Sequence, residues 1–203
     1  MNDTVSWTMR EDTIVRKVDR EGSQETFGDP ALEKVKQGQT MQFNAHVNVE
    51  ALPQGKHLKK ATIFSNVPNG GTWEIISDEG TAVGGRGSAP SPIMYFATGL
   101  ALCMMSHIEM LANQLGIDLK TRLEQKACFS TTLNLGGIHP KDVFGAADKV
   151  DIHLLIETEQ SEKDVEDFVR WCRQACMSLQ AMTQKTPANI SVKLNGAPLS
   201  KVA

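Results

Sequence analysis

Cysteine and histidine are the side chains of this 203-residue sequence whose spacing first suggests nucleophilic chemistry. Cys103 and His107 lie four residues apart in the stretch 92–115, where only Glu109 is ionised. Residues at i and i+4 share a helix face, and a nearby imidazolium lowers the pKa of a thiol and so favours the nucleophilic thiolate. The alternative is that both residues only pack in a core, because free cysteine is among the most buried residue types. Spacing alone favours core packing.

The other cysteines offer one further pair. Cys172 and Cys176 share a face of a second predicted helix, but their near-parallel Cα–Cβ directions make a disulfide between them awkward without a break in that helix. One of the two could therefore pack while the other reacts. Cys128 lies on the polar side of a predicted strand, and the sequence names no partner for it.

Metal and phosphate sites find little support in the sequence. It contains no C-x-x-C motif, and we expect no metal because the remaining histidines show no ligand spacing: His46, His57, His139 and His153. The glycine-rich stretch 78–87 lacks both the P-loop lysine and the spacing of a dinucleotide fingerprint. We expect it to turn the chain into the following helix and to hold no cofactor, although Arg86 could project from it into a site.

Composition excludes several classes of partner. The formal net charge of −3 gives no electrostatic case for binding nucleic acid or an anionic membrane. The polar first residues lack the apolar run of a signal peptide, and the longest apolar stretch, 92–105, is too short to span a bilayer. Four cysteines do not form a disulfide scaffold in a chain of this length. We therefore expect a cytoplasmic protein without a membrane or nucleic-acid partner.

Hydrophobic periodicity predicts the elements of the first half. Residues 1–40 are polar and irregular, which predicts an N-terminal extension with one or two edge strands and a helical turn at 31–36. Apolar residues alternate over 41–49, and strands at 61–67 and 73–76 complete an antiparallel meander. The nearly uncharged stretch 92–115 predicts a helix buried on most sides and capped by Gly116.

The second half predicts two strands, a helix and a last strand. The strands are expected at 119–135 and 150–156, joined by a loop over 136–148. Ser161 and Asp164 resemble an N-cap, and one amphipathic helix should follow until Pro187, before a strand at 190–194. This order predicts an α+β fold, with antiparallel sheets around a long buried central helix. Residues 41–203 would form one domain with halves 41–116 and 117–203.

A family resemblance rests on the residues that lead into the central helix. The motifs Asp-Glu-Gly at 78–80, Gly-Gly at 84–85 and Ala-Pro-Ser-Pro at 89–92 precede an apolar helix with a cysteine eleven residues after Pro92. Together they resemble the OsmC/Ohr superfamily of osmotically inducible protein C and organic hydroperoxide resistance proteins. The helix with Cys176, Pro187 and the strand after it are similar to the second-cysteine region of that family. The resemblance covers roughly residues 41–194.

The resemblance implies an OsmC-like fold, an intertwined homodimer and a thiol-dependent hydroperoxide reductase. Cys103 would attack an organic or inorganic hydroperoxide and become a sulfenic acid, and Cys176 would resolve it to a disulfide. A lipoyl or other dithiol reductant would then reduce the disulfide. His107 would be the activator of Cys103, and Cys172 is the less favoured resolver.

The sequence departs from the peroxidase members of the family at two positions. Ile93 stands where they have a glutamate that pairs with an arginine, and Met177 stands where a proline usually follows the second cysteine. His107 and Glu109 would have to replace the carboxylate electrostatically. The arginine candidates are Arg10, Arg16 and Arg20.

Two alternative functions remain open on the same fold. Ile93, Met94, Met104 and Met105 surround Cys103 in the sequence with apolar side chains. They favour a non-catalytic protein that binds a small hydrophobic ligand in a groove beside Cys103. The other alternative is a dimer whose cysteines only pack.

Overall fold

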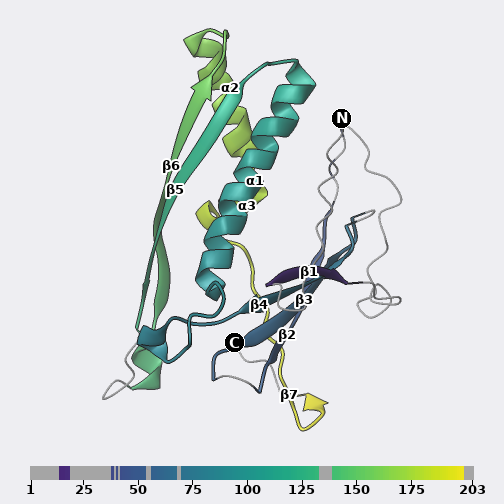
Figure 1. Cartoon of the computed structure of the whole chain (residues 1–203), viewed down its shortest axis with the longest axis vertical. Helices are drawn as coiled ribbons and strands as arrows, with labels where there is room; N and C mark the ends of the chain where they lie inside the picture. The colour runs from purple at the N-terminus through teal and green to yellow at the C-terminus, as the bar shows by residue number, and fades with distance from the viewer. Residues whose placement is uncertain are drawn as a thin grey trace. The chain divides into compact units, whose positions relative to one another are not determined.

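The chain divides into two compact units, Met1–Tyr95 and Phe96–Ala203, which are described separately (Figure 1). The structure is a computed structural model and describes residues 14–18, 38, 40, 42–53, 56–67, 70–132 and 139–198. The helical turn predicted at 31–36 lies outside these described residues. The predicted domain boundaries at 40 and 116 stay predictions.

The first unit contains a four-stranded antiparallel sheet with the order β1-β4-β3-β2. The predicted meander is confirmed as β2, β3 and β4, although β2 begins at Ala45, four residues later than expected. β1 pairs with β4 at one edge of the sheet. The strands are β1 Val15–Val18, β2 Ala45–Ala51, β3 Lys59–Ser65 and β4 Thr72–Ser77.

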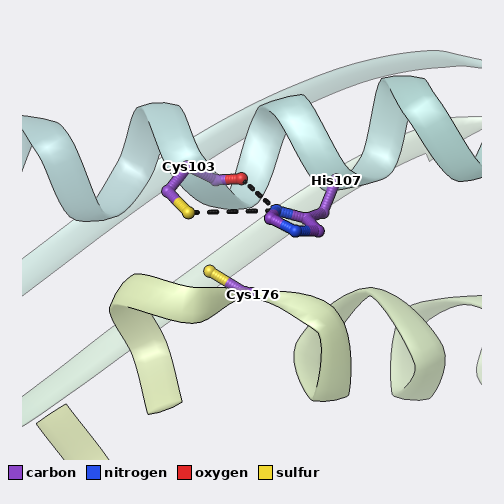
Figure 2. A group of neighbouring side chains, drawn as sticks. All are labelled: Cys103, His107 and Cys176. Carbon is purple, nitrogen blue, oxygen red and sulfur yellow. Dashed lines mark hydrogen bonds between the residues drawn. The ribbon is translucent and has the colours of Figure 1, made fainter. Parts of the chain in front are cut away.

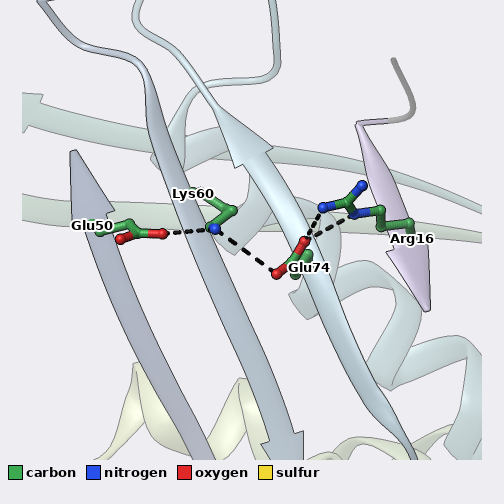
Figure 3. Close-up of polar contacts among 4 residues, drawn as sticks. All are labelled: Arg16, Glu50, Lys60 and Glu74. Atoms are coloured by element: carbon green, nitrogen blue, oxygen red, sulfur yellow. Dashed lines mark hydrogen bonds and ion pairs between the residues drawn. The ribbon is translucent and has the colours of Figure 1, made fainter. Parts of the chain in front are cut away.

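A row of charged side chains crosses this sheet (Figure 3). Glu74, whose side chain is only 6% exposed, accepts a hydrogen bond of 2.8 Å from Arg16 Nε. Lys60 Nζ lies 3.9 Å from the other Glu74 oxygen and 2.7 Å from a Glu50 oxygen. Because Arg16 is opposite Glu74 and Glu50 is opposite Lys60, the row connects all four strands in their observed register.

The loop after β4 is organised around a buried carboxylate. Asp78 is 2% exposed and accepts from the backbone N–H groups of Glu79 (2.8 Å), Arg86 (3.2 Å) and Ser88 (3.1 Å), and from the Ser88 hydroxyl (2.8 Å). These hydrogen bonds, those from Ser88 first, hold the Asp78 pKa at about 2. A Cβ at Gly85 would lie 1.9 Å from the Glu79 carbonyl oxygen, so only glycine allows this close approach. The loop folds back on itself through the short helix η1 (Thr81–Val83) before α1 begins.

The central helix α1 runs from Pro92 to Leu115 and ends as predicted. Gly116 adopts φ 66°, and the Ile117 N–H donates to the Ala112 carbonyl at 2.9 Å, a closure that favours glycine. The prediction of burial on most sides is wrong for the single chain. Only one stripe is buried, with residues four apart: Leu100, Met104, Ile108 and Ala112.

The reason for this difference is that one chain covers only one face of α1. Leu102 is 62% exposed and Met110 is 56% exposed, although both are apolar. The whole of α1 is long and apolar enough to cross a membrane by length and mean hydropathy. The stretch 92–105, on which the sequence-based expectation rests, is too short to do so. The core helix of a soluble protein passes the same test of length and hydropathy.

The second unit packs helices against a long antiparallel hairpin, β5 (Lys120–Thr131) and β6 (Gly145–Glu157). β6 begins within the loop predicted over 136–148, and η2 (Pro140–Asp142) precedes it. A register shift between Cys128 and Phe129 interrupts the ladder. Figure 1 shows α1 running along the hairpin, and side chains from both contribute to one core.

The helix predicted after Ser161 is two helices. The Ser161 cap is confirmed, since its hydroxyl accepts from the Asp164 N–H at 3.3 Å. The helix then breaks at Cys176, whose ψ of 102° is extended, into α2 (Glu162–Ala175) and α3 (Met177–Thr183). The predicted strand at 190–194 is instead a short hairpin of β7 (Lys193–Leu194) and β8 (Ala197–Pro198).

Candidate active site

The second unit brings three of the predicted site residues together (Figure 2). Cys103 and His107 lie on one face of α1, with the Cys103 sulfur 3.8 Å from His107 Nδ1. Cys176 faces them from the junction of α2 and α3. The two sulfurs and a nitrogen of His107 all lie within 4.8 Å of one another. None of the four cysteines forms a disulfide in the structure, and Cys103 and Cys176 lie there as separate thiols.

The hydrogen bonds of His107 define its tautomer. Nδ1 lies 2.8 Å from the Cys103 carbonyl oxygen. A carbonyl can only accept, so Nδ1 carries the proton and donates it. The same N–H lies near the Cys103 sulfur, which it can stabilise as a thiolate but from which it cannot take a proton. His107 is therefore placed to act as a donor to Cys103 and not as its base through Nδ1.

Residues that follow Cys176 favour the thiolate of Cys103. Partial burial raises the Cys103 pKa, but hydrogen bonds from the Ser178 hydroxyl and N–H, from the Cys176 thiol and from the Met177 N–H outweigh it. The Cys103 pKa consequently lies below that of an ordinary thiol. The Ser178 hydroxyl also lies 3.4 Å from the Cys176 sulfur and 3.5 Å from the Leu100 carbonyl. Its single proton serves only one of these acceptors at a time.

Ser178 and the backbone of Met177 are site groups that the sequence reasoning missed. The helix break at Cys176 gives the N–H groups of residues 177 and 178 no partner in the preceding helix. A proline at position 177 would have no N–H to offer. The departure from the family pattern at Met177 thus adds one donor near Cys103.

The remaining cysteines lie outside this cluster. Cys172 is fully buried, and burial raises its pKa to about 11, so it is almost entirely a thiol near neutral pH. Cys128 lies on β5 at the register shift, opposite Lys149. Of the two helical cysteines that the spacing left open, Cys176 is the one that the structure brings to Cys103.

Of the candidates for an activating ion pair, Glu109 belongs to the described part of the second unit, and it lies outside the cluster. Arg16 is bound to Glu74 in the sheet of the first unit, and Arg10 and Arg20 lie outside the described residues. Glu109 is exposed on α1, and Ile93 is 47% exposed in its first turn. Arg86 is also exposed, and its backbone N–H serves the Asp78 loop.

An apolar cavity of about 330 Å³ adjoins the buried stripe of α1. Met104, the neighbour of Cys103 in the sequence, lines it together with aliphatic side chains of β6, α2 and α3. Its polar lining residues are Thr183 and the exposed Arg173. Of the four residues expected to make the groove apolar, only Met104 lines this cavity.

Solved structures with a similar fold include several proteins named for hydroperoxide resistance. An OsmC-like hydroperoxide resistance protein from Jannaschia sp. is 16% identical, with a TM-score of 0.48 over 77% of this chain and 95% of that one. An OsmC-like protein from Mycoplasma pneumoniae is 15% identical, with a TM-score of 0.49 over 69% and 87%. The organic hydroperoxide resistance protein OhrB of Bacillus subtilis is 19% identical, with a TM-score of 0.38 over 68% and 89%.

Sequence comparison gives a firmer assignment. Curated protein sequences provide no significant match. The profile of the family described as OsmC-like protein matches residues 85–191, which is more than half of the chain and includes Cys103, His107 and Cys176. The predicted resemblance is confirmed at this level: the chain belongs to the OsmC-like protein family.

Proposed function

We propose that this protein is a thiol-dependent hydroperoxide reductase in which Cys103 is the peroxidatic cysteine and Cys176 the resolving cysteine. The observation that carries the proposal is the pair of free sulfurs within 4.8 Å of each other, one half-buried on α1 and one fully buried at the α2–α3 junction. Membership of a family that includes proteins named for hydroperoxide resistance supports it.

The chemistry proceeds in two balanced steps. The Cys103 thiolate attacks the outer oxygen of a hydroperoxide ROOH, the O–O bond breaks, and the alkoxide leaves as ROH after taking up a proton. The sulfenic acid on Cys103 then condenses with the Cys176 thiol, forming the S–S bond and releasing water. A dithiol reductant returns both cysteines to thiols. Cys103 has the lowered pKa and is the less buried of the two, which suits the attacking role.

The donors around Cys103 offer a substitute for the family glutamate that Ile93 replaces. A carboxylate–arginine pair would stabilise the thiolate by charge. Here the donors of Met177 and Ser178 stabilise it by hydrogen bonds, and His107 Nδ1 lies 3.8 Å from the same sulfur. We propose these residues as the positioning groups of the reaction, and a cytoplasmic homodimer as its setting.

The experiment is a single-turnover reaction of the reduced protein with cumene hydroperoxide, followed by thiol loss and intact mass. The wild-type chain should lose two hydrogen atoms and give one Cys103–Cys176 disulfide in peptide maps. C176S should stop at a dimedone-reactive sulfenic acid, and C103S should slow peroxide consumption at least about a hundredfold. C128S is the matched control and should react like wild type. Failure to form the Cys103–Cys176 disulfide would exclude the two-cysteine mechanism.

A second candidate function is the binding of a small apolar ligand, which the cavity beside Met104 favours. Its volume of about 330 Å³ suits a small ligand, and Arg173 suits one with an anionic group. Native mass spectrometry of the purified protein should then show a bound molecule that L179W removes and C103S leaves in place. Ligand-free wild-type protein would count against this function.

A further inference from the structure

The cluster of Cys103, His107 and Cys176 contains the donor set of a site for a thiophilic metal. Two thiolates and one imidazole are ligands that Zn²⁺ prefers, and Cys₂His sets with an open fourth position occur in zinc proteins. Two ligands four residues apart on one helix face form a metal-ligand spacing, as in H-x-x-x-H. The sequence predicts no metal because the other histidines show no ligand spacing. The third ligand of this cluster, Cys176, is 73 residues away from Cys103 and comes close only through the fold.

The distances in the cluster are close to those of a tetrahedral zinc site. Zn–S bonds of about 2.3 Å and Zn–N bonds of about 2.0 Å place two sulfurs about 3.8 Å apart and a sulfur about 3.5 Å from a nitrogen. The sulfurs of Cys103 and Cys176 and one ring nitrogen of His107 all lie within 4.8 Å of one another. Rotations about the χ angles of the two cysteines and of His107 would let the three ligand atoms close around a cation.

The hydrogen bonds around the cluster resemble the outer shell of a metal site. Metal-binding histidines usually donate their other ring N–H to a carbonyl or carboxylate, which fixes the tautomer. His107 Nδ1 donates to the Cys103 carbonyl at 2.8 Å, so the lone pair left for a cation is on Nε2. The Ser178 hydroxyl, 3.4 Å from the Cys176 sulfur, can donate to that sulfur as a thiolate.

We propose that the reduced protein binds one Zn²⁺ per chain through the sulfurs of Cys103 and Cys176 and Nε2 of His107. Three protein ligands leave the fourth tetrahedral position to water or another small ligand. This inference does not depend on peroxidase activity, since it concerns the thiolates before any oxidant acts.

One consequence rests on the proposed function, because the same two sulfurs cannot ligate zinc and form a disulfide. Hydroperoxide would oxidise the two zinc thiolates to the disulfide and release the ion. Two electrons pass from sulfur to the O–O bond, and ROOH with two protons becomes ROH and water. Bound zinc would therefore protect the thiols until an oxidant displaces it.

The experiment is an anaerobic titration of the reduced, chelator-treated full-length protein with Zn²⁺ against a chromophoric zinc chelator. We expect one tight site per chain. C103S, C176S and H107Q should each weaken its affinity by at least about tenfold. C128S and H153Q are the matched controls, since Cys128 and the exposed His153 lie outside the cluster and should leave the affinity unchanged.

A second readout does not depend on the folding of the variants. Co²⁺ added to the wild-type protein should give the thiolate-to-cobalt charge-transfer band of a sulfur-ligated site. A wild-type affinity equal to that of C103S, or a cobalt spectrum without the thiolate band, would overturn the proposal. Zinc binding without peroxide reduction would count against the proposed function alone, and peroxide reduction without zinc binding would count against this site alone.

Discussion

The two residues that follow Cys176 help determine how readily the Cys103 thiol ionises. The backbone N–H of Met177 and the N–H and hydroxyl of Ser178 lower the pKa of a sulfur that belongs to another helix. Because these donors stabilise the thiolate, they offset the burial that would otherwise disfavour it. Cys172 is fully buried without a comparable set of donors, and its pKa rises to about 11. The surroundings of Cys103 and Cys172 therefore give the same side chain two different thiol pKa values.

This contrast predicts the order in which the cysteines react with iodoacetamide. At pH 8 a thiol with a pKa of about 11 is about one part in a thousand thiolate. Cys103, whose pKa is lowered by its hydrogen-bond donors, has a much larger thiolate fraction at the same pH. The thiolate of Cys103 is less basic and therefore less nucleophilic than that of Cys172, which reduces its advantage in labelling rate by about tenfold. Cys103 should therefore be labelled at least about tenfold faster than Cys172 in reduced, metal-free protein, as measured by peptide mass spectrometry.

The labelling rate of Cys103 should also change with pH in a defined direction. Labelling of Cys103 should slow as the pH falls through its pKa, and S178A should move that midpoint upward because one donor is lost. C172S should leave the fast labelling unchanged. Equal rates at Cys103 and Cys172 would show that the donors do not stabilise the thiolate in solution.

Local patterns in the sequence correctly predict most elements of the fold. Alternation finds β2 to β6 within a few residues, and Ser161 and Gly116 mark helix ends through side-chain and backbone chemistry that is local. The pair Cys103–His107 is local in the same sense, since a helix places residues four apart on one face.

The features that the sequence did not reveal depend on distant parts of the chain. The apolar spacing of three or four continues from Cys172 through Cys176 to Leu179, so periodicity gives no sign of the helix break. β6 begins early at Gly145 because it pairs with Thr131, although its first residues show no alternation. Cys176 lies at the helix break and reaches Cys103 from a distant part of the chain, which is why spacing alone could not decide between packing and chemistry.

The charged row across the first sheet predicts unequal effects of two glutamate substitutions. Glu74 is 6% exposed and touches both Arg16 and Lys60, whereas Glu50 is 62% exposed and touches Lys60. E74Q leaves a nearly buried site without its charge and should lower the free energy of unfolding by about 2 kcal/mol. E50Q removes an exposed pair and should cost about 0.5 kcal/mol or less. Urea unfolding of both variants checks the difference, and equal losses would contradict it.

An exposed apolar surface of the second unit lies on α1, the helix that carries Cys103. α1 buries one stripe within its own chain, while Leu102 and Met110 on its other faces remain exposed. A contiguous exposed apolar surface on a helix usually marks an interaction site. Pairing of two copies through α1 would cover it and would hold Cys103 on a helix that is packed on more than one side. This is the physical argument for the proposed homodimer.

The homodimer predicts a concentration-dependent effect of substitutions at Leu102. In a two-fold interface each substitution counts twice. L102A should remove about 1.5 kcal/mol in each copy, or about 3 kcal/mol in all, and weaken the dimer roughly a hundredfold. L102D should give monomers at micromolar concentration, because burying an unpaired carboxylate costs more than the lost contact. Analytical ultracentrifugation measures both effects, with circular dichroism to verify folding. Q174D adds the same charge at an exposed position of α2 and should leave the dimer intact. A monomeric wild-type protein, or an L102A variant that dimerises like wild type, would rule out pairing through this face.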